Sequence, residues 1–359
     1  MSAAERLARR LDLGAGRAVV LHNPSNMFYI TEGYTGEGVV YVSGSKTVII
    51  TDFRYTEQAG RQAPAFEVVM TDKSVTHSQW ISRLCDQDGI NTLYFEDEFL
   101  TVKSFAKMKA ELGEGVSCVP VNNVPEELRV IKTDREIACI REACVITSKA
   151  FDMILPKIHE GITEKELQIE LDLLQLNLGA QCNSFDTIMA FGENGSLCHA
   201  IPGQRKLKKG DMITMDFGCK VGGYCSDMTR TVAFGEPSDI MRRVYTTVQR
   251  VQAETRALVA PGKSCYDVDK FARDSIDQAD PMFVGRMGHG LGHCVGIDIH
   301  ENPRFSQLCF DTTQAGMVIT VEPGIYLPGI GGVRIEDTVL ITETGYESLT
   351  TAPRDLIIL

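Results

Sequence analysis

The feature that most constrains the fold is a segment in which acidic residues lie on two short apolar strands. In DMITMDFGCKVGGYCSDMTRTVAF, residues 211–234, Asp216 alternates with apolar residues, which is the pattern of a strand with one apolar face. A second strand, carrying Asp227, follows a turn expected at 220–223. This turn would place Asp216 directly opposite Asp227, with Cβ atoms roughly 4.5–5.5 Å apart. We therefore predict an antiparallel hairpin with two facing carboxylates.

Two facing carboxylates repel each other, so such a pair is stable only when a cation or a shared proton lies between them. The alternative is a solvated strand face on which both acids are harmless. The apolar residues that flank each acid on both sides favour the first interpretation.

A second acidic segment, residues 316–341, repeats the pattern of strand, turn and strand. Glu322 is expected near the end of its first strand and Glu336 inside its second. The triplets DMT at 227–229 and EDT at 336–338 share one form, an acid followed two positions later by threonine. Because alternate residues of a strand face the same way, each threonine is expected to donate a hydrogen bond to the acid of its own triplet. This repeated triplet suggests that the region is built from two related halves.

Four carboxylates and one imidazole suit a pair of divalent ions such as Mn²⁺, Co²⁺ or Zn²⁺. Two ions roughly 3.5–4 Å apart need bridging carboxylates, which acids on strands supply. The chain has seven histidines, and His289, His293 and His300 lie together in GHGLGHCVGIDIHE. The glycines of this segment make a helix unfavourable, which excludes the helical two-histidine zinc motif. Three histidines on one metal, a division of roles and chance proximity all remain open from the residues alone.

The rest of the chain indicates two domains, as its length of 359 residues also suggests. Residues 1–122 alternate strand and helix patterns, which favours a smaller α/β domain. Residues 123–359 combine amphipathic helices with strand hairpins, which favours an α+β domain. The expected elements are strands within 38–53 and at 91–96, and helices at 75–89, 130–156, 161–180, 238–262 and 264–279.

Composition excludes several classes of function. A formal charge of −12 disfavours nucleic acid as a partner, because nucleic acid calls for a basic face. No stretch approaches the roughly 20 apolar residues of a membrane span, and the N-terminus lacks the apolar core of a secretory signal. The 11 cysteines include no Cys-Xaa-Xaa-Cys pair, which is typical of reduced thiols and predicts a cytoplasmic protein.

Taken together, the motifs resemble those of the pita-bread metallopeptidases of the Xaa-Pro aminopeptidase and prolidase group. They occur in that family's order across residues 130–359. NPSNMFYITEGYTG and TDFRYTEQAG are also similar to the family's creatinase-type amino domain. The matching segments are TMDFG with Asp216, YCSDMTRT with Asp227, GHGLGHCVGIDIHE with His293, TVEPG with Glu322, and GVRIEDT with Glu336. The resemblance implies a pita-bread catalytic domain at 123–359, an α/β amino domain at 1–122 and a homodimer.

The resemblance also implies a ligand set for two divalent metal ions. Asp227 and Glu336 would bridge the ions, Asp216 would complete one of them, and His293 with Glu322 would complete the other. Mn²⁺ is the first expectation, with Co²⁺ or Zn²⁺ as alternatives. A hydroxide held between the ions would attack the scissile carbonyl, and Glu322 would also pass a proton to the leaving proline nitrogen.

Other residues are expected on the substrate side. His199 and His300 match family histidines that contact the substrate and its developing oxyanion, whereas His289 matches a position that borders the pocket. Without the resemblance, His199 would be an ordinary loop residue. Arg334 is expected either to pair with a ligating carboxylate or to capture a substrate carboxylate, and Arg304 is a second candidate for binding a substrate terminus.

The resulting prediction is metal-dependent hydrolysis of Xaa-Pro bonds, either at the N-terminus of peptides or in dipeptides. The substrate would be a proline-containing peptide. The alternatives are a metal-free creatinase-like amidinohydrolase and a non-catalytic pita-bread binding protein, which typically lack such ligands. Methionine aminopeptidases share the ligands but do not carry an amino domain like residues 1–120. The sequence does not separate an aminopeptidase from a dipeptidase.

Overall fold

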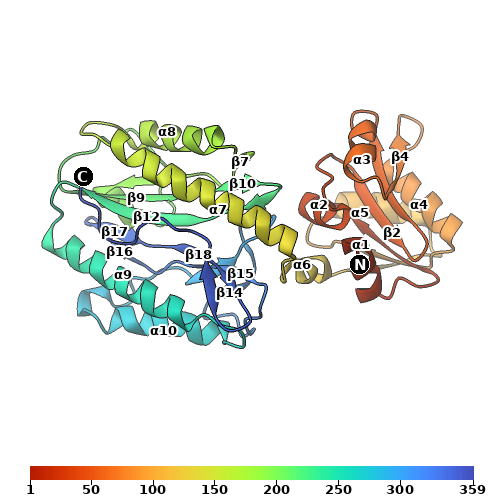
Figure 1. Cartoon of the computed structure of the whole chain (residues 1–359). Coiled ribbons are helices and arrows are strands. Elements are labelled where there is room, and N and C mark those ends of the chain that lie inside the picture. The colour runs from red at the N-terminus through yellow and green to blue at the C-terminus, as the bar shows by residue number, and fades with distance from the viewer. The chain divides into compact units, whose positions relative to one another are not determined.

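The computed structural model describes residues 1–359 and divides into two units after Arg129. The sequence predicted a junction between residues 122 and 123, and helix α6 (Val124–Arg129) lies between the two positions. Each unit has its own helices and strands (Figure 1), and apolar clusters lie within each unit. None of the helices combines the length and the apolar character that a membrane-spanning helix needs.

A six-stranded mixed sheet forms the centre of the first unit, in the order β4-β3-β2-β1-β5-β6. β1, β2 and β3 pair antiparallel, whereas β3–β4, β1–β5 and β5–β6 pair parallel. The predicted α/β layer arrangement is confirmed. Its strands are β1 (Arg17–Leu21), β2 (Val39–Ser43), β3 (Thr47–Asp52), β4 (Glu67–Thr71), β5 (Thr92–Phe95) and β6 (Ser117–Pro120). Its other helices are α1 (Ala3–Arg10), α2 (Pro24–Thr31), α3 (Thr56–Gln62), α4 (His77–Asp88) and α5 (Val102–Leu112).

Helices α4 and α5 cover one face of this sheet. Leu84 of α4 and Met108 of α5 pack in one cluster with alternate strand residues such as Tyr41. The strand residues between these, including Val19 and Val40, are buried as well, so both faces of the sheet are covered. A sheet buried on both faces has nearly continuous apolar strands, as the sequence of this unit has.

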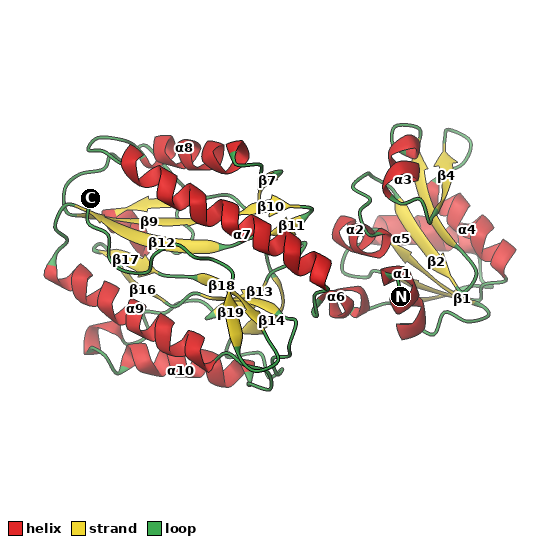
Figure 2. Ribbon diagram, in the orientation of Figure 1, coloured by secondary structure: helices red, strands yellow, loops and turns green.

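The second unit holds antiparallel strands between two pairs of helices (Figures 1 and 2). Its sheets have the orders β12-β9-β8, β14-β13-β15-β18-β19, β11-β10-β7 and β16-β17. The strands are β7 (Cys182–Asn183), β8 (Ile188–Phe191), β9 (Asp211–Phe217), β10 (Cys219–Val221), β11 (Tyr224–Cys225), β12 (Met228–Phe234), β13 (Gly292–Cys294), β14 (Glu301–Phe305), β15 (Val318–Val321), β16 (Gly324–Leu327), β17 (Gly331–Arg334), β18 (Asp337–Ile341) and β19 (Tyr346–Ser348). The helices are α7 (Asp134–Ile154), α8 (Glu164–Asn177), α9 (Asp239–Leu258) and α10 (Cys265–Asp277), with 3-10 turns η1 (Leu155–Lys157), η2 (Gly192–Ser196) and η3 (Pro281–Phe283).

The helix pairs cover different halves of this unit. α7 and α8 pack through residues such as Phe151 and Leu171 onto β8, β9 and β12. α9 and α10 pack through residues such as Val248 and Ala272 onto the sheet that contains β15 and β18. Capping boxes at Thr133 and Thr163 begin α7 and α8. The α+β prediction for this unit is confirmed.

The register of the first acidic hairpin differs from the prediction. Asp216 lies opposite Thr229, so the prediction that it lies directly opposite Asp227 is wrong by two residues. The reason is the turn, which is made by Gly222 and Gly223 alone, with φ of 55° and 85°. A two-residue hairpin turn needs positive φ at both positions, which glycine adopts without strain. Because the shift is by two residues, both acids still face the same side.

Both acidic segments contain a break that the sequence did not predict. Asp227 lies between β11 and β12, outside either strand. Glu336 lies between β17 and β18, so its predicted place inside a strand is wrong. The expected turn after Glu322 is itself a hairpin, β16–β17. The two acids therefore occupy equivalent breaks in the two halves of the unit.

The glycine-rich segment is not helical, as predicted, and contributes the short strand β13. At Gly292 a side-chain Cβ atom would lie 2.0 Å from the Thr320 carbonyl oxygen, so only glycine fits there. At Gly296 a Cβ atom would lie 2.4 Å from a carboxylate oxygen of Glu301. These glycines leave room for β15 and for the Glu301 side chain.

The core of the second unit predicts a clear difference between two substitutions in α7. Phe151 is 0% exposed and Met153 is 45% exposed. Phe151→Ala is expected to lower the free energy of unfolding by about 3–5 kcal/mol, because it opens a cavity against β9 and β12. Met153→Ala, the control, is expected to change it by less than about 0.5 kcal/mol. Equilibrium urea unfolding measures both, and equal losses would contradict this description of the core.

Candidate metal centre

Four carboxylates and one imidazole converge between the two halves of the second unit. Asp216 is near the end of β9, Asp227 and Glu336 occupy the strand breaks, Glu322 follows β15, and His293 is in β13. Asp216, Asp227, His293 and Glu336 are all less than 9% exposed, and the Glu322 side chain is 15% exposed. The structure thus brings together every residue that was expected to bind metal.

Their atoms lie close enough to share an ion. One ligand atom from each of Asp227, His293 and Glu336 falls within 4.8 Å of the others. His293 Nε2 lies 3.5 Å from Asp227 Oδ2 and 3.4 Å from Glu322 Oε1. This spacing is too long for strong hydrogen bonds and leaves room between the atoms.

Burial and mutual repulsion raise the pKa values of these acids. Burial contributes most to the raised pKa of Asp227, followed by the charges of Asp216 and Glu322. The pKa of Glu336 is raised by burial and then by Asp227. Burial likewise raises the pKa of Glu322 to about 8. Without a cation, the ionised forms of these acids are therefore disfavoured at neutral pH, and the acids tend to keep their protons.

His293 is neutral and offers an acceptor nitrogen to the carboxylates. Burial, and then the neighbouring His300, lower its pKa to about 3. Its Nδ1 lies 3.1 Å from the Cys294 carbonyl oxygen, which requires the proton on Nδ1. The lone pair on Nε2 therefore faces carboxylate oxygens. A cation between them would bind all of these acceptors.

The residues fit divalent metal ions. Asp216 Oδ1 and Glu336 Oε1 are buried and have no hydrogen-bond partner. Buried acceptors of this kind are rare in proteins because they lose their hydration without compensation. Carboxylate oxygens with one imidazole nitrogen are a donor set for hard or borderline ions such as Mn²⁺, Co²⁺ or Zn²⁺.

Two threonines each donate a hydrogen bond to the proposed ligand residue of the other half of the unit. Thr229 Oγ1 donates to Glu336 Oε2 at 2.7 Å, and Thr338 Oγ1 donates to the Asp227 carbonyl oxygen at 2.7 Å. The prediction that each threonine serves the acid of its own triplet is wrong, because the strand breaks place each one beside the other half. Thr320, which sequence reasoning missed, donates to Glu322 Oε1 at 3.2 Å and accepts from the His293 amide at 3.0 Å.

Arg334 is buried and its guanidinium is directed at the centre. Arg334 Nη2 lies 2.5 Å from Asp216 Oδ2, and Nε lies 3.1 Å from Thr229 Oγ1. Its Nη1 donates to the Tyr326 hydroxyl at 2.7 Å, and that hydroxyl lies 2.7 Å from His289 Nε2. Of the two uses expected for Arg334, pairing with a carboxylate is the one seen. Tyr326 was missed, because no motif marks it in the sequence.

The remaining candidates border the centre. The His300 ring lies 4.4 Å from that of His293, edge to face, and His300 is exposed. Arg304 is exposed and lies opposite His293 in the β13–β14 pair, so its side chain leaves the same face. Burial and then Arg304 lower the pKa of His300. His199 is exposed on the loop after η2, and its proximity contributes to the lowered pKa values of His300 and His289. His289 contacts the Tyr326 hydroxyl, which in turn accepts a hydrogen bond from Arg334.

Two family models match the chain and together span most of it. The model described as metallopeptidase family M24 matches residues 138–343. The model described as the creatinase/prolidase N-terminal domain matches residues 5–131.

Proteins similar to the whole chain include peptidases with known structures. A peptidase of Bacillus subtilis (strain 168), named YqhT and uncharacterized, is 40% identical and covers 97% of both chains. A Xaa-Pro dipeptidase from Bacillus anthracis has 37% identity and a TM-score of 0.94, covering 99% of both chains. An X-Pro aminopeptidase from Thermotoga maritima MSB8 has 31% identity and a TM-score of 0.90, covering 98% of this chain and 100% of that chain.

Chelator-treated protein is expected to be less stable at pH 8 than at pH 6.5. The pKa of Glu322 is about 8 in the folded protein against 4.5 as its ordinary value, so the folded state alone holds this proton in that window. Stability therefore falls as pH rises, by about 1.5 kcal/mol for Glu322 alone. The raised pKa values of Asp227 and Glu336 act in the same direction. Below pH 6.5 the neutral His293 opposes the trend.

Urea unfolding at the two pH values measures this difference. Saturating Mn²⁺ is expected to remove it, because a bound cation favours the ionised carboxylates. Chelator-treated protein that is equally stable at both values would contradict the electrostatic account of the centre.

Proposed function

Because the chain belongs to metallopeptidase family M24, we propose that it hydrolyses Xaa-Pro peptide bonds with two divalent cations bound at the candidate metal centre. The observation that carries the proposal is the arrangement of buried acceptors. Carboxylates of both halves face the lone pair of a neutral His293, and two of their oxygens have no donor. The named activities of the similar structures, a Xaa-Pro dipeptidase and an X-Pro aminopeptidase, support the choice of substrate.

The proposed ligand roles follow from position. Asp227 and Glu336 occupy the equivalent strand breaks, so they are proposed to contact both cations. Asp216 would hold one cation, with Arg334 orienting its other oxygen. His293 and Glu322, whose ligand atoms are 3.4 Å apart, would hold the other. When bound, such cations supply Lewis acidity for the scissile carbonyl and make an attacking water more acidic.

The chain's own residues would handle protons and charge. Glu322, whose Oε1 lies 3.4 Å from His293 Nε2 and accepts a hydrogen bond from Thr320, is proposed to pass a proton to the leaving proline nitrogen. His300 lies against His293 at the exposed side of the centre, where it would stabilise the negative charge that develops on the carbonyl oxygen. His199, on the neighbouring loop, would bind the substrate on the same side. His289 would hold Tyr326 and, through it, Arg334.

A basic residue remains for the substrate terminus. We propose this role for Arg304, which is exposed on the face that carries His293. Arg334 directs its donors at Asp216, Thr229 and Tyr326, so we assign it to support of the centre. Capture of a free carboxylate after proline would favour dipeptides, whereas an open site would admit longer peptides.

The finer properties are proposed from the residue types. Mn²⁺ suits the predominance of carboxylate oxygens, with Co²⁺ and Zn²⁺ as alternatives. A cytoplasmic location fits the 11 free cysteines. A homodimer is proposed because residues 5–131 match the amino domain of this group. A metal-free amidinohydrolase and a non-catalytic binding protein are less well supported, since neither explains the assembled ligand set.

Two histidine substitutions are expected to separate metal binding from turnover. His293→Ala should weaken Mn²⁺ binding by about tenfold or more, because it removes a proposed ligand. His300→Ala should keep wild-type Mn²⁺ affinity and lower kcat by about 10²-fold or more, because it acts on developing charge. Calorimetric titration and steady-state kinetics measure the two effects, with the exposed His159→Ala as control. Loss of metal by His300→Ala, or full retention by His293→Ala, would overturn this assignment.

The substrate proposal is tested with short peptides. The protein, loaded in turn with Mn²⁺, Co²⁺ and Zn²⁺, is incubated with Ala-Pro, Ala-Pro-Ala and the proline-free Ala-Ala-Ala. Cleavage of Ala-Pro alone identifies a dipeptidase, and release of the first residue from Ala-Pro-Ala, with Pro-Ala as the other product, identifies an aminopeptidase. The proposal fails if no metal supports cleavage of a proline peptide, or if Ala-Ala-Ala is cleaved equally well.

A further inference from the structure

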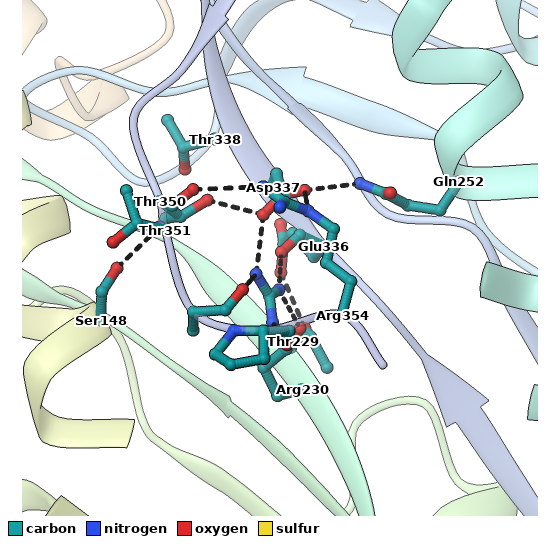
Figure 3. A network of polar contacts seen from close by, with 12 residues as sticks. Ser148, Thr229, Arg230, Gln252, Glu336, Asp337, Thr338, Thr350, Thr351 and Arg354 are labelled. Carbon is teal, nitrogen blue, oxygen red and sulfur yellow. Dashed lines mark hydrogen bonds and ion pairs between the residues drawn. The ribbon is translucent and has the colours of Figure 1, made fainter. Parts of the chain in front are cut away.

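A buried charge cluster lies directly beside Glu336, the acid of one strand break (Figure 3). Its centre is Asp337, which is 0% exposed and follows Glu336 in the chain. We call it the Asp337 cluster. Donors from separate segments converge on the carboxylate of Asp337: Arg230 Nη2 at 2.8 Å, Thr350 Oγ1 at 2.9 Å, Gln252 Nε2 at 2.8 Å, Arg256 Nη1 at 2.6 Å and Arg354 Nε at 2.5 Å.

Arg230 uses its whole guanidinium in this cluster. Its side chain is 1% exposed. Nη2 donates to Asp337 and to the Ala352 carbonyl, and Nε donates to the Pro353 carbonyl at 2.8 Å. Nη1 donates to the carbonyls of Thr229 and Glu336. Arg230 therefore joins the backbone of β12 to that of Glu336, just before β18, and to the C-terminal segment at Ala352 and Pro353.

The Asp337 cluster and the metal centre lie on opposite sides of the place where β12 passes the segment that contains Glu336 and Asp337. Thr229 and Glu336 pair on the metal side, through Thr229 Oγ1 and Glu336 Oε2. The next residue in each segment, Arg230 and Asp337, pairs on the other side. The Glu336 amide also donates to the Thr229 carbonyl at 3.1 Å. The orientation of Glu336 is thus fixed from both faces.

The composition of the cluster is unusual for a purely stabilising contact. Arg230, Arg256 and Arg354 all donate to one carboxylate, so positive charge exceeds negative charge around the buried Asp337. Burying an ion pair costs desolvation energy, and apolar packing of similar volume often stabilises a fold equally well. A polar cluster does give directional bonds. Those bonds oppose the mutual repulsion of the metal-binding carboxylates, which would otherwise separate the segments that carry them.

We infer that Asp337 and Arg230 are positioning residues for the metal centre, and that Arg354 of the C-terminal segment completes their support. They hold the backbone at Thr229 and Glu336 so that the carboxylates of Asp227 and Glu336 keep the separation that two cations require. Metal sites depend on such support, because ligands displaced by about 0.5 Å bind poorly. The inference rests on the proposed function, since it takes Asp227 and Glu336 as ligands.

The test compares two arginine substitutions in metal-free protein titrated with Co²⁺. Arg354→Met removes one donor to Asp337 from a side chain that is 27% exposed. Arg205→Met is the control, because Arg205 is 16% exposed and pairs with Asp211 at the opposite end of β9 from Asp216. Both variants should lose similar stability toward urea. Only Arg354→Met should weaken Co²⁺ binding, by about tenfold, and change the visible absorption of bound Co²⁺.

A second variant, Asp337→Asn, removes the charge at the centre of the cluster and should weaken Co²⁺ binding by about 10–100-fold. If Asp337→Asn does not fold by circular dichroism, Arg354→Met decides alone. The inference is overturned if Arg354→Met binds Co²⁺ within twofold of wild type with the same absorption, or weakens it no more than Arg205→Met. Failure of the wild-type protein to bind Co²⁺ would instead overturn the metal centre itself, and the inference with it.

Discussion

Repulsion among buried carboxylates is the constraint on which the second unit depends. Asp227 and Glu336 are brought within reach of each other and of His293, and burial raises the pKa of both acids. A fold gains nothing from such an arrangement unless a cation occupies it. Two features hold these acceptors together. β13 passes close to β15 at Gly292, and Thr229 and Thr338 each donate a hydrogen bond to the other half of the unit.

The centre is assembled from both halves of the unit, which links metal binding to the packing of the whole domain. One half contributes Asp216 and Asp227 beneath α7 and α8, and the other contributes Glu322, Glu336 and His293 beside α9 and α10. Cross-connections such as that from Arg334 to Asp216 join the halves directly. A bound cation would therefore stabilise the folded state by holding the halves together, as ligands of the native state do.

The sequence predicted the kind of residues in the site better than their geometry. Alternation around Asp216 and the glycines near His293 are local patterns, and the strand and the non-helical segment that they predicted are present. The hairpin register was misjudged, because the two-residue turn at Gly222 and Gly223 is compatible with the same alternation as a longer turn. Partners far apart in the chain, such as Arg230 and Asp337, leave no periodic signal and were missed.

The most direct test of the account is a crystal structure of the Mn²⁺-loaded protein with diffraction measured at the manganese absorption edge. The account predicts two anomalous peaks per chain that share Asp227 and Glu336 as ligands. Asp216 should contact one peak, and His293 with Glu322 the other. A single peak, or peaks that do not touch both Asp227 and Glu336, would contradict it.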